Sequence, residues 1–390
     1  MPATAAPSPF AVRTAEAWWH ARCDELLTLA TEATPHYVYD LATAQAAAER
    51  LRSLAPIARV FYAIKANPHP ALLRAFHDAG LGFECVSPGE IAQVFDTVPD
   101  LDPARVLFTP NFAPRSEYAW AFARGVRVTL DNAYGLDAWP ETFAGRDLFL
   151  RIDPGEGYGH HAHVRTAGVT SKFGIAPEDL PRAAARAREI GARIVGLHAH
   201  VGSGVDHPTA WIETAETMAR IADLFPEVRV FDLGGGLPVP SRPGTPSFDV
   251  NEAAALLQPF HDAHPEIELW LEPGRYLAAE AGVLLARVTQ LKSKGEVTYV
   301  GVDAGMHTLL RPALYGAYHE VANLTRLDAP TAITAEVVGP ICETGDVLAR
   351  ARALPETQEG DVLLIATAGA YGQAMASRYN LREPARETVL

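Results

Sequence analysis

Eight short runs of β-prone apolar residues, separated by helical segments, constrain the fold of this chain more than any other feature. The runs lie between about Arg59 and Gly274 and read RVFYAIK, LGFECVS, RVLFTP, VRVTLD, LFLRID, IVGLHAH, VRVFDLGGG and IELWLEPG. Segments such as PALLRAFHDAG and LPRAAARAREIGA have helical periodicity and lie between most of them. This alternation predicts a parallel sheet covered by helices, and eight units predict a TIM-like (β/α)8 barrel. The alternative is an open doubly wound sheet, but no GxGxxG follows the first strand.

The pattern changes after Gly282, where strand-like runs follow one another with few helices between them. These runs are VLLARVTQLKS, EVTYVGVDAG, TAITAEVVGP and DVLLIATAGA. We therefore expect an α/β plus β protein, because 390 residues exceed what one simple core holds. The expected parts are an N-terminal linker and helix (1–35), the barrel (36–282) and a mostly β C-terminal domain (283–390). The strand near residues 36–40 can join either domain.

Charge and cysteine content exclude several classes of partner. The formal net charge of −14 argues against nucleic acid or an anionic membrane as the main partner, but a locally positive pocket can still hold a small anion. The three cysteines are scattered, without disulfide or zinc spacing, which favours a reducing compartment, the cytoplasm. No apolar run of membrane-spanning length and no signal peptide are visible.

Polar residues or glycines stand repeatedly at the carboxyl ends of the eight expected strands. In a barrel of this type these ends form the rim that carries the active site. Polar side chains repeated at such positions are difficult to explain as core. The residues are Lys65, Ser87, Asn111, Asp131, Asp153, His200, Gly234–Gly236 and Glu272.

Lys65 is one of only four lysines, and it ends an apolar run. Lysine is seldom buried unless it is paired or takes part in chemistry. An amine in a low-dielectric pocket has a lowered pKa and can form a Schiff base. The alternative is a structural lysine paired with a carboxylate. Lys172, in TSKFGI, is the rival nucleophile, but its place before a helix favours a structural role.

Three further motifs lie at the rim. The glycines of DLGGGLP can converge backbone N–H groups on a phosphate, or simply form a tight turn. HVGSG supplies His200 as an aromatic plate and Ser203 as a hydroxyl donor. EPGR places Glu272 at the end of the eighth strand and Arg275 on the next loop, where the carboxylate either holds a pyridine nitrogen protonated or forms an ion pair.

Three motifs of the β domain also carry reactive residues. GPICETGD holds Cys342 and Glu343, and a cysteine beside a carboxylate is expected to stay protonated. The alternative for Cys342 is a small buried residue. RPALYGAYH supplies Arg311 and Tyr315, and GAYGQAMASRYN supplies Tyr371 in a glycine-flanked loop.

In this order, YAIKANP, HVGS, GGG, EPGR, CETGD and GAYG resemble the motifs of the fold-type III pyridoxal-phosphate decarboxylases, over about residues 35–390. The chain has Glu84 in FECVS where most members have Asp. The resemblance implies pyridoxal 5′-phosphate as cofactor and no metal. It implies that Lys65 holds the cofactor covalently, that His200 packs on its ring, that Glu272 pairs with its pyridinium nitrogen and that Cys342 donates a proton. The implied cofactor-binding residues are Lys65, His200, Ser203, Gly234, Gly235, Gly236, Glu272, Gly274, Arg275 and Tyr371.

The resemblance also implies a carboxy-lyase that converts meso-2,6-diaminopimelate to L-lysine and CO2. Arg275, Arg311 and Tyr315 would hold the distal carboxylate, because arginine matches carboxylates bidentately. Glu343 would hold the distal ammonium, and Tyr371 is a further implied substrate-binding residue. The resemblance also implies a homodimer with shared active sites, and a fusion of the chain to an aspartate kinase in a longer protein. The alternatives are decarboxylation of ornithine, lysine, carboxynorspermidine or a D-amino acid, and a non-catalytic binding homologue.

His160, His161 and His163 in GHHAHV leave a metal enzyme as a further alternative, although this spacing favours a loop over the site. The segment Gly155–Ser171, rich in glycine and histidine, is a candidate lid.

Overall fold

The computed structural model describes residues 17–154, 171–200, 202, 204, 207–240, 242 and 247–390, and it contains two compact units. The first unit is built from Ala46–Pro238 and Ser247–Gly274, and the second contains Arg275–Leu390 and the stretch that ends at Gln45. Within the described residues, no helix is both long enough and apolar enough to cross a membrane.

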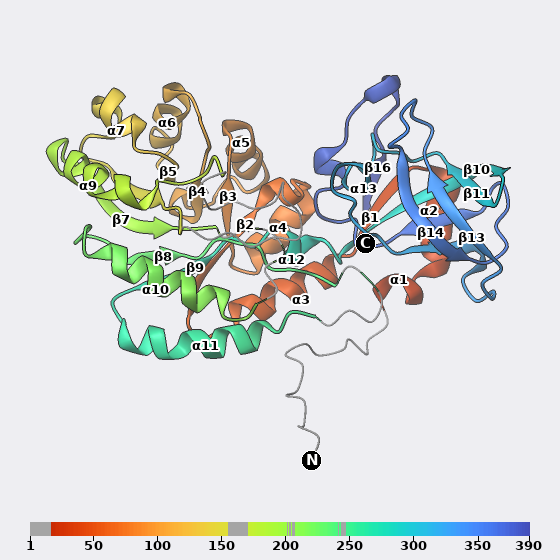
Figure 1. The fold of residues 1–390 in the computed structure, drawn as a ribbon, viewed down its shortest axis with the longest axis horizontal. Helices are drawn as coiled ribbons and strands as arrows, with labels where there is room; N and C mark the ends of the chain where they lie inside the picture. The colour runs from red at the N-terminus through yellow and green to blue at the C-terminus, as the bar shows by residue number, and fades with distance from the viewer. Residues whose placement is uncertain are drawn as a thin grey trace, which may run out of the picture. The chain divides into compact units, whose positions relative to one another are not determined.

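The first unit is a closed barrel of eight parallel strands, paired in chain order, with the last strand completing the ring by pairing with the first (Figure 1). This confirms the eight runs and the barrel fold, and it excludes the open sheet. The strands are β2 (Ile57–Ala63), β3 (Gly82–Cys85), β4 (Val106–Phe108), β5 (Arg127–Leu130), β6 (Asp147–Arg151), β7 (Arg193–His198), β8 (Val230–Asp232) and β9 (Glu268–Leu271).

Helices follow most strands and bury one apolar face against the barrel (Figure 1). Local signals start them: Pro70 stands at the first position of its helix, and the Ser87 hydroxyl accepts from the N–H of Glu90 at 3.2 Å. The helices are α3 (Leu41–Arg52), α4 (Pro70–Asp78), α5 (Pro88–Thr97), α6 (Arg115–Phe122), α7 (Tyr134–Ala138), α8 (Pro140–Phe143), α9 (Leu180–Glu189), α10 (Ala210–Ala222) and α11 (Val250–Ala263).

The barrel interior is layered because alternate residues of a strand share one face. A buried apolar cluster fills the middle: Phe61, Leu107, Phe149, Val230 and Trp270. Two residues further along four of these strands, toward their carboxyl ends, the inward positions are polar: Thr109, Arg151, Asp232 and Glu272. Since buried polar groups need partners, this layer holds the hydrogen-bonded network described below.

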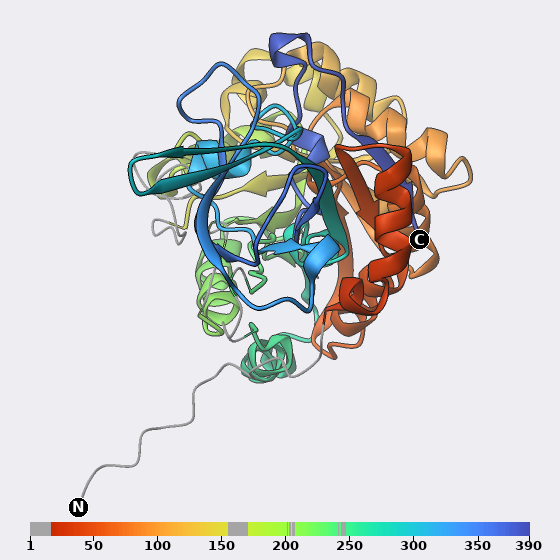
Figure 2. The ribbon, with the colours of Figure 1, turned by 90° about the vertical axis from the view of Figure 1, so that its right-hand side faces the viewer.

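The second unit is built on an eight-stranded sheet in the order β12-β15-β10-β11-β13-β14, and β1 joins it by pairing with β10 and β16. Its strands β10 and β11 form a long antiparallel hairpin, drawn in teal in Figure 2. Helix α2 packs Leu26 and Ala30 against Leu285 and Leu364 of the sheet. The strands are β1 (His36–Tyr39), β10 (Gly282–Lys294), β11 (Val297–Val302), β12 (Val321–Asn323), β13 (Ile333–Val338), β14 (Val347–Leu354), β15 (Val362–Ile365) and β16 (Arg386–Val389), and the helices are α1 (Trp18–Ala21), α2 (Cys23–Glu32), α12 (Arg275–Ala278) and α13 (Arg311–Tyr315).

Candidate active site

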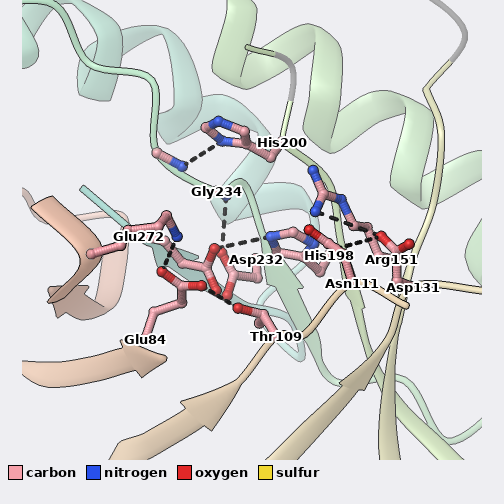
Figure 3. A network of polar contacts seen from close by, with 12 residues as sticks. Glu84, Thr109, Asn111, Asp131, Arg151, His198, His200, Asp232, Gly234 and Glu272 are labelled. Atoms are coloured by element: carbon pink, nitrogen blue, oxygen red, sulfur yellow. Dashed lines mark hydrogen bonds and ion pairs between the residues drawn. The ribbon is translucent and has the colours of Figure 1, made fainter. Parts of the chain in front are cut away.

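Lys65 lies in a short 3-10 turn directly after β2 and forms an ion pair with Glu84 of β3. Glu84 is 1% exposed, and its other carboxylate oxygen accepts from the hydroxyl of Thr109 (Figure 3). The Lys65 side chain is 41% exposed, so the ammonium lies at the mouth of the barrel. Lys65 is therefore both an amine at the barrel rim and a lysine paired with a carboxylate, so the structure contains features of both expectations.

Glu272 follows β9 and is held by His198 of β7, whose Nε2 lies 3.0 Å from one carboxylate oxygen (Figure 3). The other oxygen, Oε1, is buried with no hydrogen-bond partner among the described residues. Burial alone would raise the pKa of Glu272, but the charge and hydrogen bond of His198, together with Lys65, lower it to about 2. An ionised carboxylate with one vacant oxygen can accept a proton donor from a bound ring.

Asp232 of β8 lies beside Glu272 and takes the opposite protonation state. Burial, and then the neighbouring charge of Glu272, raise the pKa of Asp232 well above its ordinary value. Its Oδ1 also accepts from the N–H of Gly234 at 2.9 Å. The side chains of His198, Asp232 and Glu272 offer ligand atoms within 4.8 Å of one another, so the two acids are close enough for the charge on Glu272 to keep the proton on Asp232.

A third group joins the carboxyl ends of β5 and β6. Arg151 and Asp131 are both buried, with Nη1 of Arg151 3.6 Å from Oδ1 of Asp131. Asn111 donates to the same oxygen at 3.0 Å (Figure 3). The guanidinium of Arg151 also lies 4.4 Å from the centre of the Phe173 ring. These contacts hold a positive charge in the polar layer of the barrel.

His200 and the glycine turn after β8 fit closely together. Nδ1 of His200 accepts from the N–H of Gly235 at 3.1 Å, and burial and then the nearby cations Arg151 and Lys65 lower the pKa of His200 to about 3. The ring is therefore neutral. A Cβ on Gly235 would lie 2.4 Å from the carbonyl oxygen of Glu272, so this close approach requires glycine. The N–H groups of Gly234 and Gly235 donate to Asp232 and His200. The third glycine of the turn, Gly236, has an N–H without a hydrogen bond to a described residue.

In the second unit, a group of cations and aromatic rings gathers near the start of α12 and α13. The guanidinium of Arg275 lies 5.1 Å from the centre of the Tyr371 ring. Arg311 is buried, and its Nε has no hydrogen-bond partner among the described residues. Burial, and then the charge of Arg275, lower the pKa of Arg311. Tyr315 and Tyr371 each raise the pKa of both arginines, so the three residues predicted to hold a distal carboxylate lie close to one another and to Tyr371.

Cys342 and Glu343 are exposed on the second unit. The N–H of Cys342 donates to Oδ1 of Asn380 at 3.1 Å, and Glu343 accepts from the hydroxyl of Tyr379 at 2.6 Å. Gly274 is buried in the bend between β9 and α12. Ser203, the histidines of GHHAHV and all but the last residue of the candidate lid lie outside the described residues.

Several residues of the network are absent from the predicted site. They are Glu84, Thr109, Arg151, His198 and Asp232, and each lies within one residue of the carboxyl end of its strand, whereas Asp131 was already expected at the rim. Arg151, His198 and Asp232 are charged or titratable residues within apolar runs, which is the same signal that marked Lys65. These three residues are therefore identifiable from the sequence as candidate site residues.

A barrel with a rim lysine, a neutral histidine beside a glycine turn and a buried carboxylate with a vacant oxygen is a site for a ring that carries an aldehyde and a basic nitrogen. The family model for the pyridoxal-binding domain of pyridoxal-dependent decarboxylases matches residues 41–279. The chain belongs to this family of carboxy-lyases, and pyridoxal 5′-phosphate is its cofactor.

Individual proteins of known name resemble this chain over most of its length. The chain is 39% identical to the diaminopimelate decarboxylase of Methanothermobacter thermautotrophicus, over 85% of this chain and 80% of that one. It is 37% identical to the diaminopimelate decarboxylase of Deinococcus radiodurans, over 92% and 90%. Among solved structures, that of Helicobacter pylori diaminopimelate decarboxylase complexed with L-lysine covers 94% of this chain and 93% of its own, with a TM-score of 0.85 and 28% identity.

The residues of the barrel fit the cofactor at three points. Lys65 supplies the primary amine for a Schiff base at the barrel mouth. The buried Oε1 of Glu272 lacks a partner among the described residues and can accept from a protonated pyridine nitrogen. The N–H of Gly236, which bonds to no described residue, is available to an anion such as the phosphate.

Proposed function

We propose that this chain decarboxylates meso-2,6-diaminopimelate to L-lysine and CO2, the last step of lysine biosynthesis. The observation that carries the choice of substrate is the buried guanidinium of Arg311, which lies near Arg275 with its Nε unpartnered among the described residues. Two adjacent cations favour an anionic group of the ligand, because a carboxylate would offset their repulsion. Diaminopimelate has a carboxylate at its far end, whereas ornithine and lysine have none. The names of the curated relatives support the same choice.

Within the barrel, the proposed roles follow from the contacts. Lys65 would hold the cofactor, and Glu84 accepts a hydrogen bond from the Lys65 ammonium. His200, neutral and bonded to Gly235, would pack against the ring. Gly234–Gly236 and Gly274 would bind the phosphate, a role that the family resemblance also gives to Ser203. Pyridoxal phosphate, when bound, withdraws electrons from the Cα of an attached amino acid, so that the bond to the carboxylate can break. Glu272, ionised beside His198, keeps the ring nitrogen protonated during this step.

After CO2 has left, Cα needs a proton on one face. We assign this role to Cys342, supplied by a partner subunit, because an exposed thiol can reach a neighbouring chain. The same assignment makes the protein a homodimer with shared active sites. Arg275, Arg311, Tyr315 and Tyr371 bind the distal carboxylate, and the exposed Glu343 binds the distal ammonium.

The test is CO2 release from meso-diaminopimelate, ornithine, lysine and carboxynorspermidine, measured side by side. We expect turnover of diaminopimelate at least about tenfold above the others, which corresponds to about 1.4 kcal/mol. Greater turnover of another substrate would identify a different decarboxylase. An absence of turnover with all four, together with no absorbance from bound cofactor, would identify a non-catalytic homologue.

A pair of variants isolates the substrate argument. Arg311→Met should raise the KM for diaminopimelate by about tenfold or more, since an unpaired charged group costs roughly 1–3 kcal/mol. It should leave inhibition by lysine nearly unchanged, because lysine has no distal carboxylate. Arg326→Met is the matched control, since Arg326 pairs with Asp361 elsewhere in the second unit. Equal losses for diaminopimelate and lysine would contradict the assignment of Arg311.

Three expectations belong to the same proposal. Sedimentation of the holoenzyme tests the homodimer. Fractionation of the cells tests the cytoplasmic location, which the three free cysteines support. Fusion to an aspartate kinase stays a prediction, and the length of the native polypeptide tests it.

A further inference from the structure

A polar pocket lies at the opposite end of the barrel strands from Lys65. It has a volume of about 400 Å3 and is lined by the first residues of β2, by Gly80 and Gly82, and by Arg52, Arg59 and Arg105. All these residues belong to the first unit. The carboxyl-end rim holds the reaction in barrels of this type, so this pocket is separate from the candidate active site.

Three of the arginines at this end are held in place by backbone carbonyl groups. Arg52 donates from Nη1 to the carbonyl of Ala79 at 2.7 Å, and Arg105 donates from Nη2 to that of Leu81 at 2.5 Å. Arg127, the first residue of β5, donates from Nε to the carbonyl of Ala104 at 2.8 Å. Each guanidinium has five N–H donors, so these bonds orient the groups and leave other donors available.

Arg59 completes the group by stacking. Its guanidinium lies 5.3 Å from the centre of the Trp270 ring, and that of Arg127 lies 5.2 Å from the same ring. Burial and the neighbouring charge of Arg59 lower the pKa of both Arg105 and Arg127, which places their positive charges within range of one another. Stacked, carbonyl-bound guanidinium groups are preorganised, so little entropy is lost when an anion binds.

The nearby carboxylates do not balance these charges. Glu268 lies 3.5 Å from Nε of Arg59, and it also accepts from the indole N–H of Trp270. Asp102 raises the pKa of Arg105 in part, but its side chain accepts from the N–H of Ala104. Asp147 pairs with Arg193 at 2.5 Å. Among the described residues, Glu268 is the one carboxylate within ion-pair distance of these arginines, while Asp102 and Asp147 act on Arg105 or Arg127 from further away. Four arginines therefore outnumber three carboxylates, in a chain whose formal net charge is −14.

We propose that this pocket, which we name the basal arginine pocket after Arg52, Arg59 and Arg105, binds a small multivalent oxyanion, such as inorganic phosphate or the phosphate groups of a metabolite. Guanidinium forks match the tetrahedral oxygens of phosphate and form charge-assisted hydrogen bonds with them. The volume of about 400 Å3 is large enough for a small molecule that carries such phosphate groups. Hydrogen bonds to the carbonyls of Ala79 and Leu81, just after α4, explain the positions of Arg52 and Arg105, but they do not explain why three arginines converge on one cavity.

The probe is inorganic pyrophosphate, titrated by calorimetry into the holoenzyme at constant ionic strength set with potassium chloride. Bound cofactor occupies the phosphate side of the candidate active site, and constant salt removes general screening effects. We expect one site per barrel. Arg59→Gln and Arg105→Gln should each weaken binding by about tenfold, as expected for loss of a charge-assisted contact. Glu268→Gln keeps an acceptor for Trp270 and should tighten binding by about threefold.

Two controls separate this pocket from other sources of affinity. Arg193→Gln removes an equal charge at the same end of the barrel, outside the pocket, and should leave the affinity unchanged. Arg311→Met should also leave it unchanged, because that residue belongs to the candidate substrate site. The proposal is overturned by a holoenzyme that binds no pyrophosphate, by equal losses in Arg193→Gln and Arg59→Gln, by loss of binding in Arg311→Met, or by a Glu268→Gln protein that binds no more tightly. Should Arg105→Gln fail to fold, Arg59→Gln and Glu268→Gln decide the outcome.

Discussion

The ion pair between Lys65 and Glu84 has an asymmetry that can be measured in the protein stripped of cofactor. The Glu84 side chain is 2% exposed, whereas that of Lys65 is 41% exposed. Lys65→Met therefore leaves a carboxylate that water cannot reach, with Thr109 as its remaining hydrogen-bond partner among the described residues. Removing one partner of a buried pair costs about 3–5 kcal/mol, and the bond from Thr109 places the expected loss near the lower limit, at about 3 kcal/mol at pH 7.5.

The same loss should depend on pH. In the variant, acid pH favours the neutral form of the buried carboxylate, because an uncompensated buried charge is unfavourable. The penalty should therefore be smaller at pH 5.5 than at pH 7.5. The double variant Lys65→Met/Glu84→Gln replaces the charge by a neutral amide and should recover about 2 kcal/mol at pH 7.5 and little at pH 5.5.

Urea unfolding of the four proteins, at one protein concentration and at both pH values, gives the free energies of unfolding. Glu84→Gln alone is the control for the amide in the presence of Lys65. A Lys65→Met penalty of equal size at pH 7.5 and pH 5.5 would refute the reasoning. So would a double variant that is no more stable than Lys65→Met at pH 7.5.

Three further predictions concern the same barrel. Glu272→Gln keeps a hydrogen bond to His198 but cannot hold the ring nitrogen protonated, so the rate of CO2 release should fall by roughly 10²-fold or more while the absorbance of bound cofactor remains. Gly235→Ala places a Cβ 2.4 Å from the carbonyl oxygen of Glu272 and should lower the melting temperature and the cofactor occupancy, whereas Gly89→Ala, with only an ordinary contact at 3.7 Å, should lower neither. Burial, and then the charge of Glu84, raise the pKa of Glu90 from 4.5 to about 7. The folded state therefore binds this proton more tightly, and stability is lost as pH rises from about 4.5 to 7. In Glu90→Gln, the urea midpoint should depend less on pH over that range.

The barrel strands could be predicted from the sequence because buried parallel strands are apolar on both faces, and residues such as Lys65 then interrupt a run visibly. Strands of the second unit were harder to identify. Strand β14, VLARARAL, carries Arg350 and Arg352 between its apolar residues, and β12 and β16 are three and four residues long. Short or half-exposed strands give a weak pattern, and their pairing partners lie far away in the chain.

The composition of the site was predictable in part, for a different physical reason. Lys65, His200 and Glu272 stand at strand ends beside recognisable motifs, so position alone marks them. His198 and Asp232 lie within apolar runs of the same kind, and the runs mark them as unusual without showing what they contact. Their importance comes from the distances between their side chains, and those distances depend on how β7, β8 and β9 close side by side in the barrel. No single run contains that information.

The protonation of the polar layer follows from this closure. Two carboxyl groups, Asp232 and Glu272, share one buried place, and two adjacent buried charges of the same sign are unfavourable, so one acid holds a proton. The partners decide which one: Glu272 accepts from His198 and lies within range of the Lys65 charge, whereas Asp232 has the N–H of Gly234. Glu272 is therefore the ionised acid, and its vacant oxygen is the one available to the ring nitrogen of the cofactor. Replacing His198 by Phe should reverse this preference, so that a protonated Glu272 weakens cofactor activation even though every residue that touches the cofactor is unchanged.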